Sequence, residues 1–99
     1  MKPVTVTTVE GYGFHPTGEA HQERSLFVVN PGVPIEDAME SLSELLSSAG
    51  ETLYATAMGE RTLLLHDAWL VKHTLDAAKA VVDSLKESLT AQRLKPHGA

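Results

Sequence analysis

The stretch LLHDAWLVKHTLDAAKAVVDSLKESL, residues 64–89, decides the fold of this chain. Its apolar residues follow one another at alternating spacings of four and three, and the series is Leu64, Ala68, Val71, Leu75, Ala78, Val82, Leu85 and Leu89. This heptad pattern is typical of a helix that packs against partner helices along one seam. We therefore predict a long helix here, with these eight positions as its core and dimer seam.

A second helix is predicted upstream of this one. Pro34 suits the first helical turn, and Glu36 and Asp37 directly after it place negative charge at the positive end of the helix dipole. Apolar residues then recur at heptad spacing, namely Ile35, Met39, Leu42, Leu46, Ala49, Leu53 and Ala57. The phase continues through Gly50, so we predict one helix that ends at Gly59 in a left-handed C-terminal cap.

A short polar turn separates the two helices, so we expect them to be antiparallel neighbours. Further apolar residues lie outside the two seams, namely Ala38, Leu45, Leu65, Trp69, Leu70 and Val81. Two helices cannot bury both sets, and a chain of 99 residues has a size at which oligomerisation often adds stability. We therefore predict that two hairpins associate into a homodimeric four-helix bundle.

The N-terminal third is predicted to be a β-ribbon. A β-branched run alternates with period two at residues 4–9, and residues 25–30 form a second β-prone run. The segment from Gly11 to Arg24 between them has the composition of a loop. The predicted fold is therefore a single α+β domain with an N-terminal β-ribbon and loop (1–33), an antiparallel helical hairpin (34–90) and a frayed tail (91–99).

Several short segments carry a family resemblance: Leu26-Phe27-Val28-Val29, Gly32-Val33, Glu36-Asp37-Ala38, Leu45-Leu46, Ala57-Met58 and Ala78-Lys79-Ala80-Val81-Val82-Asp83. Together they resemble a family of short uncharacterised pseudomonad proteins, domain of unknown function family 3077. The resemblance spans about Arg24 to Leu89 and leaves the N-terminal strand and loop outside. It implies the helical hairpin, but no activity and no site residue.

Composition limits the classes of function that the sequence supports. The chain has no cysteine, which fits a reducing compartment, and its apolar runs are too short to span a bilayer. A net charge of −5 disfavours nucleic acid as a partner. We predict a cytoplasmic, non-enzymatic homodimer that binds another protein, with no catalytic residue, cofactor or metal.

One candidate binding flank lies beside the seam of the second helix. His66, Trp69 and His73 lie along this flank, with Asp76 beyond them. A helix rises about 10 Å between residues seven apart, so the two imidazoles are too far apart to share one metal ion. The expected role of Trp69 is in the core or the dimer interface.

The predicted loop offers a second candidate. His15 and His21 lie in it near Glu19 and Glu23, and histidine with carboxylate is the chemistry of acid–base catalysis. No motif carrying a nucleophile accompanies them, so we favour a solvated loop.

A basic stripe gives the alternative function. Basic residues recur every seven positions on the second helix, at Lys72, Lys79, Lys86 and Arg93. An accessory nucleic-acid-binding or transcription-linked regulator would use such a stripe to bind phosphates. Asp76 and Asp83 are interleaved with these lysines, and the antiparallel hairpin would bring Lys86 and Arg93 near the carboxylates at the start of the first helix. We therefore favour ion pairing over phosphate binding.

Overall fold

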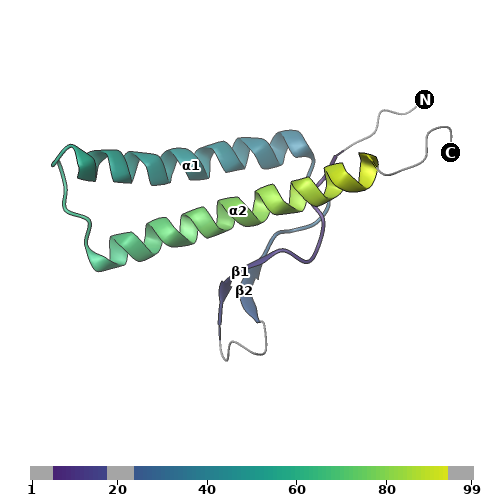
Figure 1. Cartoon of the computed structure of the whole chain (residues 1–99), viewed down its shortest axis with the longest axis horizontal. Coiled ribbons are helices and arrows are strands. Elements are labelled where there is room, and N and C mark those ends of the chain that lie inside the picture. Colours follow the sequence, from purple (N-terminus) through teal and green to yellow (C-terminus); the bar gives the residue numbers. More distant parts are fainter. Residues whose placement is uncertain (1–5, 18–23, 94–99) are drawn as a thin grey trace.

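The structure is a computed structural model and describes residues 6–17 and 24–93 of the chain. A two-stranded antiparallel ribbon precedes two long helices. The elements in chain order are β1 (Gly13–Pro16), β2 (Ser25–Val28), α1 (Ile35–Ala57) and α2 (Leu65–Arg93). The helices lie antiparallel to one another, and the ribbon lies beside α2 (Figure 1). The predicted order of a ribbon followed by a helical hairpin is confirmed.

Helix α1 begins and ends where the sequence predicts. Pro34 precedes it with φ −58° and ψ 146°, and the Pro34 carbonyl accepts the N–H of Ala38 at 3.0 Å. Pro34 therefore acts as the N-cap, with no side chain capping the helix there. Gly50 lies inside α1 as predicted, and its α-carbon has free space around it, with no atom within 4 Å of where a Cβ would stand.

The C-terminus of α1 is closed by a Schellman motif. Gly59 adopts a φ of 78°, and its N–H donates to the carbonyl of Thr56 at 3.1 Å. The next N–H, that of Glu60, donates to the carbonyl of Ala55 at 2.9 Å. These two bonds satisfy carbonyls that the end of a helix would leave without partners. The left-handed conformation at position 59 favours glycine there. The predicted cap at Gly59 is confirmed.

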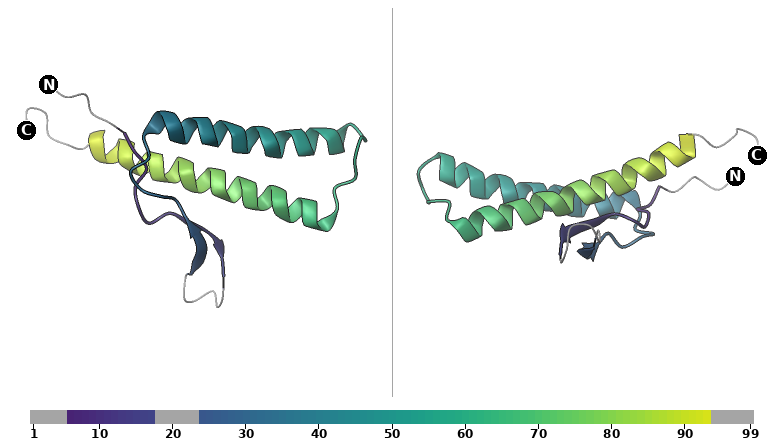
Figure 2. Two further views of the ribbon diagram at one scale, coloured as in Figure 1. Left: turned by 180° about the vertical axis from the view of Figure 1, so that it is seen from behind. Right: turned by 60° about the horizontal axis from the view of Figure 1, so that its bottom comes forward.

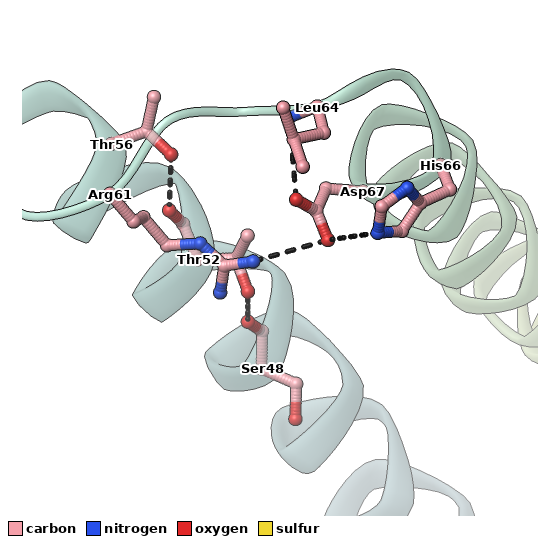
Figure 3. Close-up of polar contacts among 7 residues, drawn as sticks. All are labelled: Ser48, Thr52, Thr56, Arg61, Leu64, His66 and Asp67. Atoms are coloured by element: carbon pink, nitrogen blue, oxygen red, sulfur yellow. Dashed lines mark hydrogen bonds and ion pairs between the residues drawn. The ribbon is translucent and has the colours of Figure 1, made fainter.

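Helix α2 begins with a carboxylate cap. Asp67, in the first turn, accepts the N–H of Leu64 at 3.3 Å, and its other oxygen lies 3.1 Å from the Arg61 guanidinium (Figure 3). The cap satisfies one of the N–H groups that a helix start leaves free. The helix then continues to Arg93, a cation in the last turn that suits the negative end of the dipole. Residues 91–93, expected in the frayed tail, are therefore helical, and residues 94–99 lie outside the described residues.

The first strand lies elsewhere than the sequence predicts. β1 falls inside the predicted loop, and it pairs with β2 so that Phe14 lies opposite Phe27 and Pro16 opposite Ser25. The predicted strand at residues 4–9 is wrong in its described part, where an isolated bridge joins Thr7 and Pro34. Stacking of the two phenylalanines, with ring centroids 5.5 Å apart, supplies a cross-strand contact that sets the register of this short ribbon.

The segment before β1 ties the ribbon to the helices. The buried Thr8 hydroxyl donates to the Asn30 carbonyl at 2.7 Å and accepts the Val33 N–H at 3.0 Å. The Val9 N–H donates to Ser84 Oγ at 2.7 Å, and the same hydroxyl donates back to the Val9 carbonyl at 2.9 Å. Backbone bonds also join this run to the segment before α1, since the Thr8 N–H donates to the Val33 carbonyl and the Gly32 N–H to the Thr8 carbonyl, both at 2.9 Å. The β-branched run is therefore held by one isolated bridge and by side-chain bonds, and not by a regular strand pairing.

The core is small and consists largely of alanine and leucine. Its buried apolar residues are Val29, Ala38, Leu42, Ala49, Ala78, Ala80 and Leu85. The ribbon lies on one side of the hairpin only, as the right-hand view of Figure 2 shows. Within the described residues, neither helix has the length and apolar content needed to cross a membrane.

Candidate functional site

Four rings from three elements meet where the ribbon contacts α2. β1 contributes Phe14 and His15, β2 contributes Phe27, and α2 contributes His73. Phe27 lies at the centre of the group, with ring centroids 5.5 Å from Phe14, 5.7 Å from His15 and 5.3 Å from His73. We call these four residues the ring cluster. It brings together side chains that lie up to 59 positions apart in sequence.

The two imidazoles of the ring cluster contact one another directly. Nδ1 of His15 lies 3.3 Å from Nδ1 of His73, and the ring planes are inclined at 75°. One ring must carry its proton on Nδ1 and the other on Nε2 for this contact to be a hydrogen bond. His15 also has a φ of 61°, a left-handed conformation uncommon outside glycine.

An open cavity of about 330 Å³ lies beside this histidine pair. Its lining comprises His15, Pro16, Trp69, Lys72, His73 and Asp76. Lys72 Nζ lies 2.7 Å from Asp76 Oδ2, so the charges at the cavity wall neutralise each other. The cavity is therefore lined by two histidines and an exposed tryptophan beside a lysine–aspartate pair.

The structure separates the members of the candidate binding flank predicted on the second helix. Trp69 and His73 both line the cavity, and Trp69 is 65% exposed, so the expectation of a core position is wrong for the single chain. His66 lies apart from them, with Nε2 3.6 Å from Asp67 Oδ1, the oxygen that pairs with Arg61 (Figure 3). The sequence does not predict the contacts of His73 with the phenylalanines and His15, because His15 lies in a segment that has the composition of a loop.

The loop candidate is only partly described. His15 lies in β1 and contacts His73, while Glu19, His21 and Glu23 lie outside the described residues. Among the described side chains, no group of three or more histidine, aspartate or glutamate residues converges. Both carboxylates of this candidate lie outside the described residues, so acid–base chemistry in the loop stays a hypothesis from the sequence.

The basic stripe forms ion pairs along α2. Lys79 Nζ lies 2.6 Å from Asp83 Oδ2, and Lys72 pairs with Asp76 in the same way. Both pairs have the four-residue spacing that favours contact on a helix. The pairing within α2 agrees with the interleaved aspartates, but in the described residues no ion pair joins Lys86 or Arg93 to the start of α1.

The predicted seam of α2 is only partly buried in the single chain. Ala78 and Leu85 are buried and Val71 is half-buried, while the exposed members are Leu64, Ala68, Leu75, Val82 and Leu89. The first helix shows the same division, with Leu42 and Ala49 buried and exposed side chains at Met39, Leu46 and Leu53. The hairpin therefore presents apolar side chains to solvent at heptad positions of both helices.

Comparison with known proteins identifies the family. Residues 9–88 match the family described as "Protein of unknown function (DUF3077)". This match covers most of the chain, so the protein belongs to that family. The match begins at Val9 and includes β1 and the loop, which were expected to lie outside the resemblance. No curated protein and no solved structure matches the chain.

Proposed function

We propose that this member of the DUF3077 family is a cytoplasmic, non-enzymatic homodimer that binds another protein. In the dimer, two hairpins pack as a four-helix bundle and carry their ribbons on the outside. The observation that carries the proposal is a set of six exposed apolar side chains at heptad spacing, here called the open face: Met39, Leu46 and Leu53 on α1 and Leu75, Val82 and Leu89 on α2.

The spacing of these residues supports a continuous surface. Residues seven apart differ by only about 20° around a helix, so the three members on each helix form a stripe. On α1 the stripe is bordered by Leu42 and Ala49, which are buried, and on α2 by Ala78 and Leu85, which are buried as well. Each stripe therefore runs along the edge of a buried contact zone of the hairpin.

Both stripes face away from the ribbon. Ser84, whose hydroxyl bonds the segment before β1, lies two residues after Val82 and hence on the opposite side of α2. On α1, Ser41 lines the cavity beneath the ribbon and lies two residues after Met39. The uncovered side of the hairpin is therefore the apolar one, and a second copy would cover it.

The size of the open face suits a dimer. Helix α1 is 23 residues long, which corresponds to about 35 Å, and two adjacent helices are about 20 Å wide. The face therefore measures on the order of 700 Å² per chain, close to the roughly 800 Å² that each partner contributes to a stable protein interface. A symmetric pairing of identical faces is the commonest arrangement of soluble homo-oligomers.

A second apolar region supports the binding of another protein. Leu65, Trp69 and Leu70 are 77%, 65% and 64% exposed around the first turns of α2. Exposed aromatic and aliphatic side chains of this kind are common anchors in protein interfaces. The alternative of nucleic-acid binding has weaker support, because aspartates neutralise two of the lysines of the stripe.

Sedimentation velocity of the purified chain tests the dimer. We expect the wild type to sediment as a dimer at micromolar concentration. Leu46→Glu and Leu75→Glu should shift it to a monomer with similar helix content by circular dichroism, because each places a charge in the open face. Leu65→Glu is the matched control, since Leu65 is exposed but lies outside the open face, and this variant should remain dimeric. A compact wild-type monomer, or dissociation of the control as well, would refute the proposal.

A further inference from the structure

The histidine pair of the ring cluster has the geometry of two metal ligands. We propose that His15 and His73 bind a divalent transition-metal ion that prefers imidazole nitrogen, represented by Zn²⁺, through their Nδ1 atoms. Zinc binds histidine nitrogen at about 2.0–2.1 Å, usually with tetrahedral geometry. Two such ligands on one ion are about 3.3–3.4 Å apart, and the two Nδ1 atoms lie 3.3 Å apart.

Neighbouring rings hold both imidazoles in place. The ring planes of His15 and Phe27 are inclined at 79°, and His73 is inclined at 66° to Phe27 and at 53° to Phe14. Phe27 thus packs against both ligands. Ligands held in place by their neighbours lose less freedom when the ion binds, which favours affinity.

The backbone at His15 adds a second observation. Its left-handed φ of 61° places this residue in a conformation that the surrounding structure must maintain, and such positions cluster at binding sites. Gly13, two residues earlier, allows the close approach of the strands, because a Cβ there would lie 2.7 Å from the Ser25 side chain. Together these features present the His15 ring to α2.

The described residues supply two protein ligands and no more, since no larger group of histidine and carboxylate side chains converges there. Water fills the remaining positions, facing the open cavity beside Trp69. Asp76 lines this cavity but is engaged by Lys72. We therefore expect one ion per chain, bound with micromolar affinity.

Binding requires a change in where one proton resides. In the hydrogen-bonded pair, one ring carries its proton on Nδ1, and this nitrogen must become free to ligate. The proton moves to Nε2 of the same ring, so both histidines ligate as neutral imidazoles through Nδ1. In acid, protons compete with the ion for both rings, and the affinity should fall.

Metal binding would fasten the ribbon to α2. The two ligands lie 58 residues apart in sequence, one in β1 and one in the N-terminal third of α2. The open face of the hairpin contains neither histidine and is directed away from the ribbon. The site is therefore independent of the proposed dimer, and the monomeric Leu75→Glu variant should bind zinc as the wild type does.

Isothermal titration of the full chain, prepared without a polyhistidine tag, tests the site. We expect one Zn²⁺ per chain, no binding of Mg²⁺ or Ca²⁺, and an affinity at pH 5 at least roughly tenfold below that at pH 7.5. His15→Asn, which tolerates the left-handed backbone, and His73→Gln should each weaken binding by at least roughly tenfold. His66→Gln, at an exposed histidine outside the cluster, is the matched control and should bind normally.

A second readout on the wild type avoids any effect of substitution on folding. Zinc should shift the imidazole ¹⁵N signals of His15 and His73 in NMR spectra and leave those of His66 unchanged. The proposal is overturned if zinc does not bind below millimolar concentration, if His15→Asn and His73→Gln bind as well as the wild type, or if the shifted signals are those of other histidines.

Discussion

Two glycines of similar sequence context have opposite structural roles. Gly59 closes α1 with a φ of 78°, where a side chain costs about 1 kcal/mol, so Gly59→Ala should destabilise the fold. Gly50 lies inside α1 with free space around it, and alanine is favoured over glycine there by about 1 kcal/mol, so Gly50→Ala should raise the melting temperature. Thermal melts at one protein concentration compare the pair. Effects of the same sign in both variants would contradict the assigned ends of α1.

Ser84 is the polar residue on which the N-terminal segment most depends. Its side chain is fully buried and exchanges two hydrogen bonds with the Val9 backbone. Ser84→Ala leaves the N–H and carbonyl of the half-buried Val9 without these partners, which should lower the free energy of unfolding by about 1–3 kcal/mol. Chemical denaturation measures the loss. Ser88→Ala, the same change at a buried position one turn later, should have a clearly smaller effect, and an equal loss in both would disprove the role of the Val9 bonds.

The start of α2 depends on one carboxylate. Burial by itself would raise the pKa of Asp67, but the Leu64 N–H and the Arg61 guanidinium outweigh it and hold the pKa below the usual 3.8. A carboxyl whose pKa is lower in the folded state stabilises the fold above its unfolded pKa, and this contribution is lost as the pH falls through the folded value.

Asp67→Asn should therefore be less stable than the wild type at pH 7, and the difference should shrink as the pH falls below about 4. Urea denaturation at pH 7 and at pH 2.5 measures it. Glu51→Gln, which removes an equal charge from an exposed position on α1, is the control and should show a smaller difference at pH 7. A stability gap for Asp67→Asn that does not change with pH would argue against the cap.

At the scale of the whole molecule, burial separates two leucines of one seam. Leu85 is 4% exposed and belongs to the core of the single chain, while Leu75 is 42% exposed and belongs to the open face. Leu85→Glu should abolish helix content at any concentration, because it buries an unpaired charge. Leu75→Glu should leave a folded monomer, so circular dichroism together with sedimentation distinguishes the two. Unfolding of both variants would mean that the chain has no stable monomeric fold.

The proposed dimer makes the stability of the protein depend on protein concentration. A dimer that dissociates on unfolding gains stability by mass action, so the melting temperature of the wild type should rise when the protein concentration is raised tenfold. The Leu75→Glu variant should melt at the same temperature at both concentrations. A concentration-independent wild-type melt would contradict the proposed dimer.

The helices could be predicted from the sequence because their signals are local. Heptad spacing, Pro34 before α1 and Gly59 after it act within a few residues, and the structure places both ends of α1 accordingly. The ribbon could be predicted only as a type of element. The β-branched run at residues 4–9 has strong strand propensity, yet in its described part it is held by long-range bonds to Ser84, Asn30 and residues 32–35.

The candidate site could not be predicted from the sequence, because only the tertiary structure brings its residues together. The sequence identified His73 and Trp69 by their helical spacing, but His15 and Phe27 reach them only because the ribbon folds against α2. Contacts across dozens of residues leave no periodic trace in one sequence. The sequence thus determined the two helices, the ends of α1 and the apolar stripes, since these follow from local backbone geometry. Tertiary packing alone decided which stripe positions stay exposed and that two histidine nitrogens lie 3.3 Å apart.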